Sequence, residues 1–358
     1  MAGKAQTQSR SGPPGVVLHI GLHKTGTRFV QRRILRPLDG HRLQVNPSPL
    51  WSAIRNAVRY PDDAAARGIA RDAVQAWRHS RDPRTLVLSE PHISGDMYGN
   101  HHDHLANTRL MRELFPEARI IYFVRNQTDW LQSAYRQQLV KGGSVPMHVF
   151  LNHYEGAFRP RLDRWTYGAR TVEALNQRFL DIYKGYAEAF GPERVYLFRQ
   201  EDLNTRPERV RARLAEALGV IGLAPDTDTR RENRSYSALA IRLFHPGTNR
   251  TLPAPSRRDA GMPARRLRRV TAPFIRLRRL LIQHVFDRII YRDWDLLAHA
   301  DMRARINAHY AEENEHLRII AATVLDHGPG THERAATARR HQCTPDQDDR
   351  KVPLTAGG

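Results

Sequence analysis

Residues 16–35 read VVLHIGLHKTGTRFVQRRIL, and this stretch decides the fold. The apolar run 16–22 predicts a strand buried on both faces of a parallel sheet, and residues 25–35 predict a helix. The loop between them aims backbone N–H groups and the positive end of the helix dipole at one point. Gly26 lets the backbone approach an anion closely, and Lys24 supplies a point charge. The stretch therefore predicts an anion-binding loop suited to phosphate. It is not a Walker A motif, because Lys24 precedes Gly26.

Strands and helices alternate outward from this loop. The other expected strands are 85–88, 119–124 and 194–198, and the expected helices are 62–79, 103–115, 127–140, 172–190 and 206–218. Two C-terminal helices follow, and the second carries Ile306, Tyr310, Leu317, Ile320 and Val324. This order predicts an α/β fold, a P-loop-type doubly wound parallel sheet flanked by helices, with extra C-terminal helices. We expect one domain over 16–327, between a disordered N-terminus (1–15) and a disordered polar tail (328–358).

Composition narrows the class of protein. The formal net charge is 57 − 37 = +20 and the pI is near 10.8, so anionic partners are expected. Cys343 is the single cysteine of 358 residues, which excludes a disulfide framework and a multi-cysteine zinc site. No apolar run approaches the roughly 20 residues that span a bilayer, and residues 1–15 lack the apolar core of a signal peptide. We therefore expect a cytoplasmic protein.

A second anion site is expected at the end of strand 119–124. Arg125 follows this strand directly, at the edge where open α/β sheets bind ligands. Ser133 lies two turns into the next helix. An arginine fork and a serine hydroxyl suit phosphate oxygens, so the pair predicts a second phosphate site beside the loop.

Together these motifs resemble the sulfotransferase superfamily that uses 3′-phosphoadenosine 5′-phosphosulfate (PAPS). Residues 19–27, HIGLHKTGT, match the HIGxHKTGT signature of a bacterial subgroup similar to carbohydrate sulfotransferases. Arg125 and Ser133, followed by Tyr135, match the spacing of the family's 3′-phosphate site. Weaker similarities are VYLFRQEDL (195–203), Asn233-Arg234-Ser235, and Tyr310 with Asn314. The resemblance spans residues 16–325.

The resemblance implies transfer of a sulfuryl group from PAPS to a hydroxyl of a carbohydrate or glycoconjugate, without a metal. Lys24 would neutralise the leaving oxygen during in-line transfer. The implied cofactor-binding residues are Lys24, Thr25, Gly26, Thr27, Arg28, Arg125 and Ser133. Arg28 stands where the family usually has a second threonine, so its role is open between a phosphate contact and solvent.

The acceptor hydroxyl needs a general base, and two candidates follow the strand 85–88. Glu90 stands at the position where relatives place a catalytic glutamate, and His92 is its rival. The nearby His101, His102 and His104 lack a carboxylate pattern of known metal-site spacing, so no metal is expected.

One basic segment leaves several interpretations open. Residues 257–279 hold nine arginines and one aspartate, and the helix after residue 271 carries Phe274, Leu277, Leu281, Val285 and Ile289. This helix suits an anionic membrane surface, at the inner membrane face, or an acidic glycan, and it also fits a core helix with a solvated arginine face.

Two other functions compete with the sulfotransferase. A P-loop phosphotransferase would need the Walker A motif and a strand-end aspartate for magnesium, and neither is evident. A basic nucleic-acid-binding or polyanion-binding protein would fit the charge, but no nucleic-acid-binding motif supports a specific nucleic-acid partner.

Overall fold

A computed structural model describes residues 15–223, 236–261, 273–275, 277–297 and 301–329. The disordered segments predicted over 1–15 and 328–358 lie almost entirely outside the described residues, as do Thr271 and Cys343.

The core of the fold is a five-stranded sheet in the order β2-β3-β1-β4-β9. Its strands are β1 (Val16–His19), β2 (Leu43–Val45), β3 (Thr85–Ser89), β4 (Arg119–Val124) and β9 (Val195–Arg199). Every neighbouring pair is parallel, with β1 between β3 and β4. The predicted doubly wound parallel sheet is therefore confirmed, and the carboxyl ends of β1, β3 and β4 meet at one edge.

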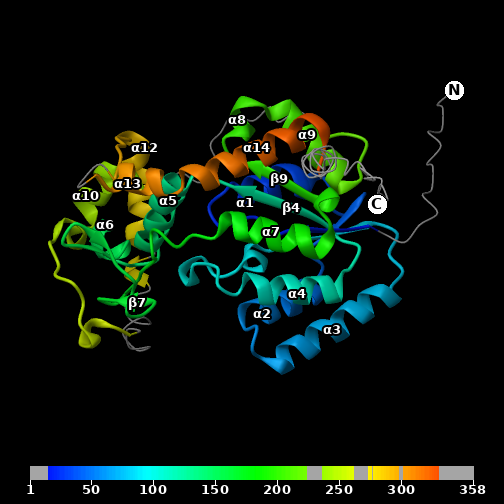
Figure 1. The fold of residues 1–358 in the computed structure, drawn as a ribbon, viewed down its shortest axis with the longest axis horizontal. Coiled ribbons are helices and arrows are strands. Elements are labelled where there is room, and N and C mark those ends of the chain that lie inside the picture. The colour runs from blue at the N-terminus through cyan, green and yellow to red at the C-terminus, as the bar shows by residue number, and fades with distance from the viewer. Residues whose placement is uncertain (1–14, 224–235, 262–272, 276, 298–300, 330–358) are drawn as a thin grey trace, which may run out of the picture.

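Helices cover both faces of the sheet (Figure 1). The longer ones are α2 (Leu50–Arg59), α3 (Ala64–His79), α4 (His104–Leu114), α5 (Gln127–Val140), α7 (Phe179–Phe190), α9 (Pro207–Leu218), α13 (Met302–His309) and α14 (Ala311–His327). In Figure 1, α9 and α14 lie on one side of β4 and β9, and α7 and α4 lie on the other.

Shorter elements gather mainly at the far end of α5, where Figure 1 shows α6, α10, α12 and α13 beside the β7 hairpin. Their bounds are α6 (Met147–Phe150), α10 (Ala238–Phe244) and α12 (Asp287–Ile289), with the hairpins β5 (His153–Tyr154) to β6 (Ala157–Phe158) and β7 (Trp165–Thr166) to β8 (Ala169–Arg170). Two further short helices follow strands of the sheet: α1 (Thr27–Phe29) comes after β1, and α8 (Asp202–Thr205) comes after β9.

The apolar strands of the sequence are buried on both faces. Ile120, Ile121, Tyr122 and Phe123 of β4 are all fully buried. Burying a large apolar side chain contributes roughly 1.5–3 kcal/mol, so β4 needs an uninterrupted apolar run rather than an alternating one.

Two predicted helices differ from the structure. The helix expected over 172–190 begins only at Phe179. Tertiary hydrogen bonds hold the segment before it in an irregular path, because Val172 N donates to Phe150 O at 2.9 Å and Tyr310 Oη donates to Ala174 O at 3.0 Å. The last predicted helix divides at Tyr310 into α13 and α14. Tyr310 thus lies at both departures: it contacts the irregular segment before α7, and it stands between α13 and α14.

The segment after the anion-binding loop also differs in detail. The helix predicted over 25–35 starts at Thr27 and becomes a π-helix, η1, over Val30–Leu35. Pro37 does not end it, because a 3₁₀ turn continues over Arg36–Leu38. β2 and α2 were not expected from the sequence. The apolar positions of α2, at residues 50, 53, 54, 57 and 58, follow the helical spacing that would have revealed it.

Candidate functional site

The loop between β1 and α1 has a backbone that few residues adopt. Lys24 and Gly26 have φ angles of 70° and 86°, in the left-handed region. The hydroxyls of Thr25 and Thr27 both donate to Leu22 O, at 2.8 and 3.1 Å. These hydroxyls therefore hold the loop in shape, and the two threonines can offer an anion their backbone N–H groups.

The Lys24 ammonium lies among other positive charges. Its Nζ donates to Gln137 Oε1 at 3.3 Å. Burial, and then the charges of Arg28, Lys141 and Arg125, lower the pKa of Lys24 from 10.5 to about 8. Within the described part of the chain, no carboxylate forms an ion pair with Lys24. A buried ammonium that lies among other cations and has no ion pair of its own favours the binding of a polyanion.

Arg125 and Ser133 line one pocket of about 370 Å³, between α5 and residues 293–295. Three carboxylates share the pocket, those of Asp129, Asp293 and Asp295. Each of them is paired with Arg136 or Arg303. Among the described residues Arg125 forms no direct ion pair, although the charges of Asp129 and Glu201 act on it, so its guanidinium is the cation that suits a phosphate here.

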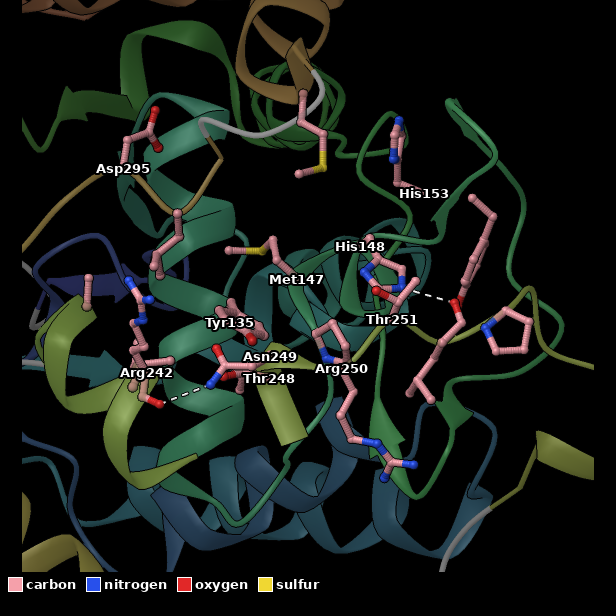
Figure 2. A pocket seen from close by; sticks show the side chains of 18 of the residues that line it. Tyr135, Met147, His148, His153, Arg242, Thr248, Asn249, Arg250, Thr251 and Asp295 are labelled. Atoms are coloured by element: carbon pink, nitrogen blue, oxygen red, sulfur yellow. Dashed lines mark hydrogen bonds between the residues drawn. The ribbon is translucent and has the colours of Figure 1, made fainter. Parts of the chain in front are cut away.

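A larger cleft adjoins this pocket and shares Trp294 and Asp295 with it. Its volume is about 1180 Å³, and Figure 2 shows Tyr135, His148 and Arg250 among the side chains around it. Aromatic rings beside a few polar groups suit a flat, polar ligand such as a base or a sugar.

Glu90 and His92 form a pair at the carboxyl end of β3. Glu90 Oε1 lies 2.6 Å from His92 Nδ1, and Oε2 lies 3.6 Å from Arg55 Nε. Glu90 is only 4% exposed, whereas the His92 side chain is 23% exposed. The carboxylate can therefore orient the imidazole, and the imidazole is the member of the pair that an acceptor can reach.

Ser89, which directly precedes this pair, forms hydrogen bonds to three neighbouring segments at the edge of the sheet. A hydrogen bond of 2.8 Å joins Ser89 Oγ to His19 Nδ1 of β1. Gln31 of η1 donates from Nε2 to the same Oγ at 2.9 Å, and Asn46, after β2, accepts from Ser89 N at 2.7 Å. Burial lowers the pKa of His19 to about 4, so this imidazole is neutral at pH 7. One residue thus ties β1, β2, β3 and the helix of the anion-binding loop together.

Two contacting residues were not expected from the sequence. The His23 and His92 rings meet edge to face at 4.6 Å, and Gln137 holds Lys24. Burial, followed by the charge of His92, lowers the pKa of His23 well below its ordinary value. Gln137 could have been found from its position, because it follows Ser133 by four residues on the same helix face. His23 could have been found because it lies inside the motif HIGLHKTGT, residues 19–27.

The remaining candidates are an exposed arginine beside the loop and a buried histidine. Arg28 is exposed at the start of α1. His101 is buried against Trp130 and Phe179, and burial first of all lowers its pKa to about 3. Within the described residues, no group of three or more His, Cys, Asp or Glu side chains is arranged to hold a metal ion. In the same part of the chain, none of the helices has the length and apolar character to span a membrane.

A parallel sheet whose carboxyl edge carries a cationic loop and an arginine pocket defines an α/β protein with a site suited to a phosphate-bearing ligand. Comparison with known families gives the particular kind. The model described as "Sulfotransferase family" matches residues 17–223, more than half of the 358 residues. The chain belongs to the sulfotransferase family, and it is therefore a transferase.

Three solved structures are similar to the chain at low identity. A sulfotransferase from Alicyclobacillus acidocaldarius is 17% identical over 66% of this chain and 92% of that chain, with a TM-score of 0.42. A sulfotransferase domain from the curacin biosynthetic pathway is 15% identical over 83% and 98%, with a TM-score of 0.36. The sulfotransferase domain of the Synechococcus PCC 7002 olefin synthase is 15% identical over 79% and 98%, with a TM-score of 0.33. No curated protein matches the chain.

Proposed function

We propose that the protein transfers a sulfuryl group from PAPS to a hydroxyl of a carbohydrate or glycoconjugate acceptor, and that residues 16–327 form the sulfotransferase domain. The observation that carries this proposal is the Lys24 ammonium, which is largely buried near Arg28, Lys141 and Arg125 and forms no ion pair with a carboxylate among the described residues. Two separate cationic sites, at Lys24 and Arg125, fit a donor with phosphate groups at its 5′ and 3′ positions.

In this proposal the loop residues bind the 5′ end of the donor. The backbone of Thr25, Gly26 and Thr27 faces the phosphosulfate, and Lys24 opposes the charge that grows on the leaving oxygen. PAPS supplies the activated sulfuryl group when it is bound. Arg125 and Ser133 hold its 3′-phosphate. Arg28, exposed beside the loop, stays a predicted phosphate contact. Lys24 gains most in the transition state, because negative charge builds on the leaving oxygen only as its bond to sulfur breaks.

The proton of the acceptor hydroxyl goes to the Glu90–His92 pair. The sequence favoured Glu90 itself as the base. Its burial, and its 2.6 Å distance to His92 Nδ1, support a division of roles between the two. His92 takes the proton at Nε2, and Glu90 fixes the ring and stabilises the imidazolium that forms.

A direct assay tests the function. The purified protein is incubated with ³⁵S-labelled PAPS and a panel of neutral, carboxylated and sulfated sugars, in parallel with γ-³²P-labelled ATP. Label from PAPS should appear on at least one sugar, and label from ATP on none. Transfer from ATP alone would overturn the proposal in favour of the phosphotransferase. The Lys24→Met variant should lose transfer. The matched control, Lys184→Met, changes an exposed position of α7 and should keep it.

Peripheral association with an anionic membrane is part of this proposal, and an exposed stripe supports it. Phe274, Leu277, Leu281, Val285 and Ile289 are between 51% and 77% exposed, so the core-helix interpretation is wrong for these five side chains. The exposed Arg279 and Arg288 accompany them, which suits anionic headgroups.

Vesicle sedimentation tests this association. Vesicles that contain phosphatidylglycerol should pull the protein down, and phosphatidylcholine alone should not. Leu281→Ser with Ile289→Ser should weaken binding, whereas Ile69→Ser, 60% exposed on α3, should not. Absence of binding, or a dimer that these two substitutions dissociate, would refute membrane association.

A further inference from the structure

A polar stripe along α5 runs past the transfer centre. Ser133, Gln137 and Lys141 follow at intervals of four residues, which places them on one face of the helix. Ser133 lines the pocket of Arg125, and Gln137 holds Lys24. Lys141, at the C-terminal cap, lies one turn or about 6 Å further. Lys141 is thus beyond Lys24 on the side away from the 3′-phosphate pocket.

In-line transfer places the attacking and leaving oxygens on opposite sides of the transferred group. The leaving oxygen belongs to the donor, whose 3′-phosphate pocket lies toward Ser133. The acceptor must therefore approach from the end of the stripe where Lys141 stands.

An arginine and an aromatic ring meet Lys141 there. Lys141 Nζ lies 5.6 Å from the centre of the Tyr98 ring, and Arg170 Cζ lies 5.1 Å from the same centre. Arg170, on the β7–β8 hairpin, also lies 5.2 Å from the Trp165 ring. Aromatic faces attract cations, so the Tyr98 ring holds both charges within reach of one site.

In the described part of the chain, neither Lys141 nor Arg170 forms an ion pair with a carboxylate. The nearby carboxylate, Asp96, is paired with Arg164 at 3.3 Å. Desolvation, and then the charge of Arg170, lower the pKa of Lys141; the charge of Asp96 opposes this shift and that of Arg59 adds to it. Like charges held together are unfavourable until an anion joins them.

We propose that Lys141 and Arg170, held on the Tyr98 ring, form a subsite for an anionic group of the acceptor, a carboxylate or a sulfate ester. This inference rests on the proposed function, because it uses the position of the donor to define the acceptor side. It makes the enzyme selective for sugars that already carry a negative charge near the reacting hydroxyl.

Binding to the full chain loaded with 3′-phosphoadenosine 5′-phosphate (PAP) tests the subsite. The probes are 4-nitrophenyl glucoside, its 6-sulfate and the corresponding glucuronide, which separate neutral, sulfated and carboxylated sugars. At least one anionic probe should bind about tenfold or more tightly than the neutral one by calorimetry. Lys141→Gln and Arg170→Gln should each remove most of this preference without weakening PAP. Lys184→Gln, an equal loss of charge on α7, should leave the preference intact.

Three results would overturn the subsite: equal binding of neutral and anionic probes, no binding of any probe, or weaker PAP binding in Lys141→Gln, which would assign Lys141 to the donor. Failure of the proposed function is a separate outcome, because PAP would then not bind the wild-type protein. The probes are also titrated against the protein without PAP, so the subsite is decided in that case too.

Discussion

Binding of PAP should take up a proton through Lys24. The Lys24 pKa is about 8 in the free protein, about 2.5 units below 10.5, so its charge costs roughly 3 kcal/mol there. A bound polyanion offsets this cost and raises the pKa again. Between about pH 7 and pH 8, Lys24 is mostly charged and the phosphates of PAP are mostly ionised, so PAP affinity changes little. Above pH 8 binding must add the proton, and affinity falls by up to about tenfold per pH unit.

Calorimetry measures this uptake in two buffers of different ionisation enthalpy, free of phosphate and sulfate. At pH 8 we expect about half a proton per PAP, because half of the Lys24 side chains are then neutral and phosphate, with a second pKa of about 6, is already ionised. Lys24→Met should abolish the uptake, and Lys184→Met should not. If the wild type took up no proton, or if Lys24→Met took up the same number, Lys24 would not be the group that gains the proton when PAP binds.

Three further outcomes are expected. PAP should bind at least about tenfold more tightly than AMP, and Arg125→Gln should remove the difference, as calorimetry would show; equal affinities in the wild type would count against two phosphate sites. EDTA should leave sulfuryl transfer intact, and loss of activity restored by magnesium or zinc would favour the phosphotransferase. His92→Ala should lower kcat by ~10²–10⁴ with PAP affinity nearly unchanged. Glu90→Gln should also lower kcat, because the His92 ring would lose the carboxylate that orients it. Full turnover in both variants would contradict the assignment of the base to this pair.

The sequence predicted the parallel sheet because β1, β3, β4 and β9 are short apolar runs that alternate with helices. It also placed Lys24, Glu90 and Arg125 at strand ends, which the sheet order brings to one edge. Contacts between distant segments were beyond its reach. The bond from Lys24 to Gln137 spans 113 residues, and the ring contact that joins Lys141 to Tyr98 depends on how α5 crosses the sheet edge. The irregular path before Phe179 likewise depends on Tyr310, far along the chain.

The hydrogen bonds of Ser89 have a consequence for how the reactants meet. Ser89 connects the strand end that carries the proton acceptor to His19, below the loop, and to Gln31, on the loop's own helix. The loop that would bind the donor and the strand end that carries the Glu90–His92 pair are thus connected by hydrogen bonds, and thermal motion moves them together. The distance between the two reacting atoms then varies little, which raises their effective molarity without any lid having to close. A loss of the Ser89 hydroxyl would remove none of the reacting groups. It would still slow the reaction, because the positions of these groups relative to one another would vary more.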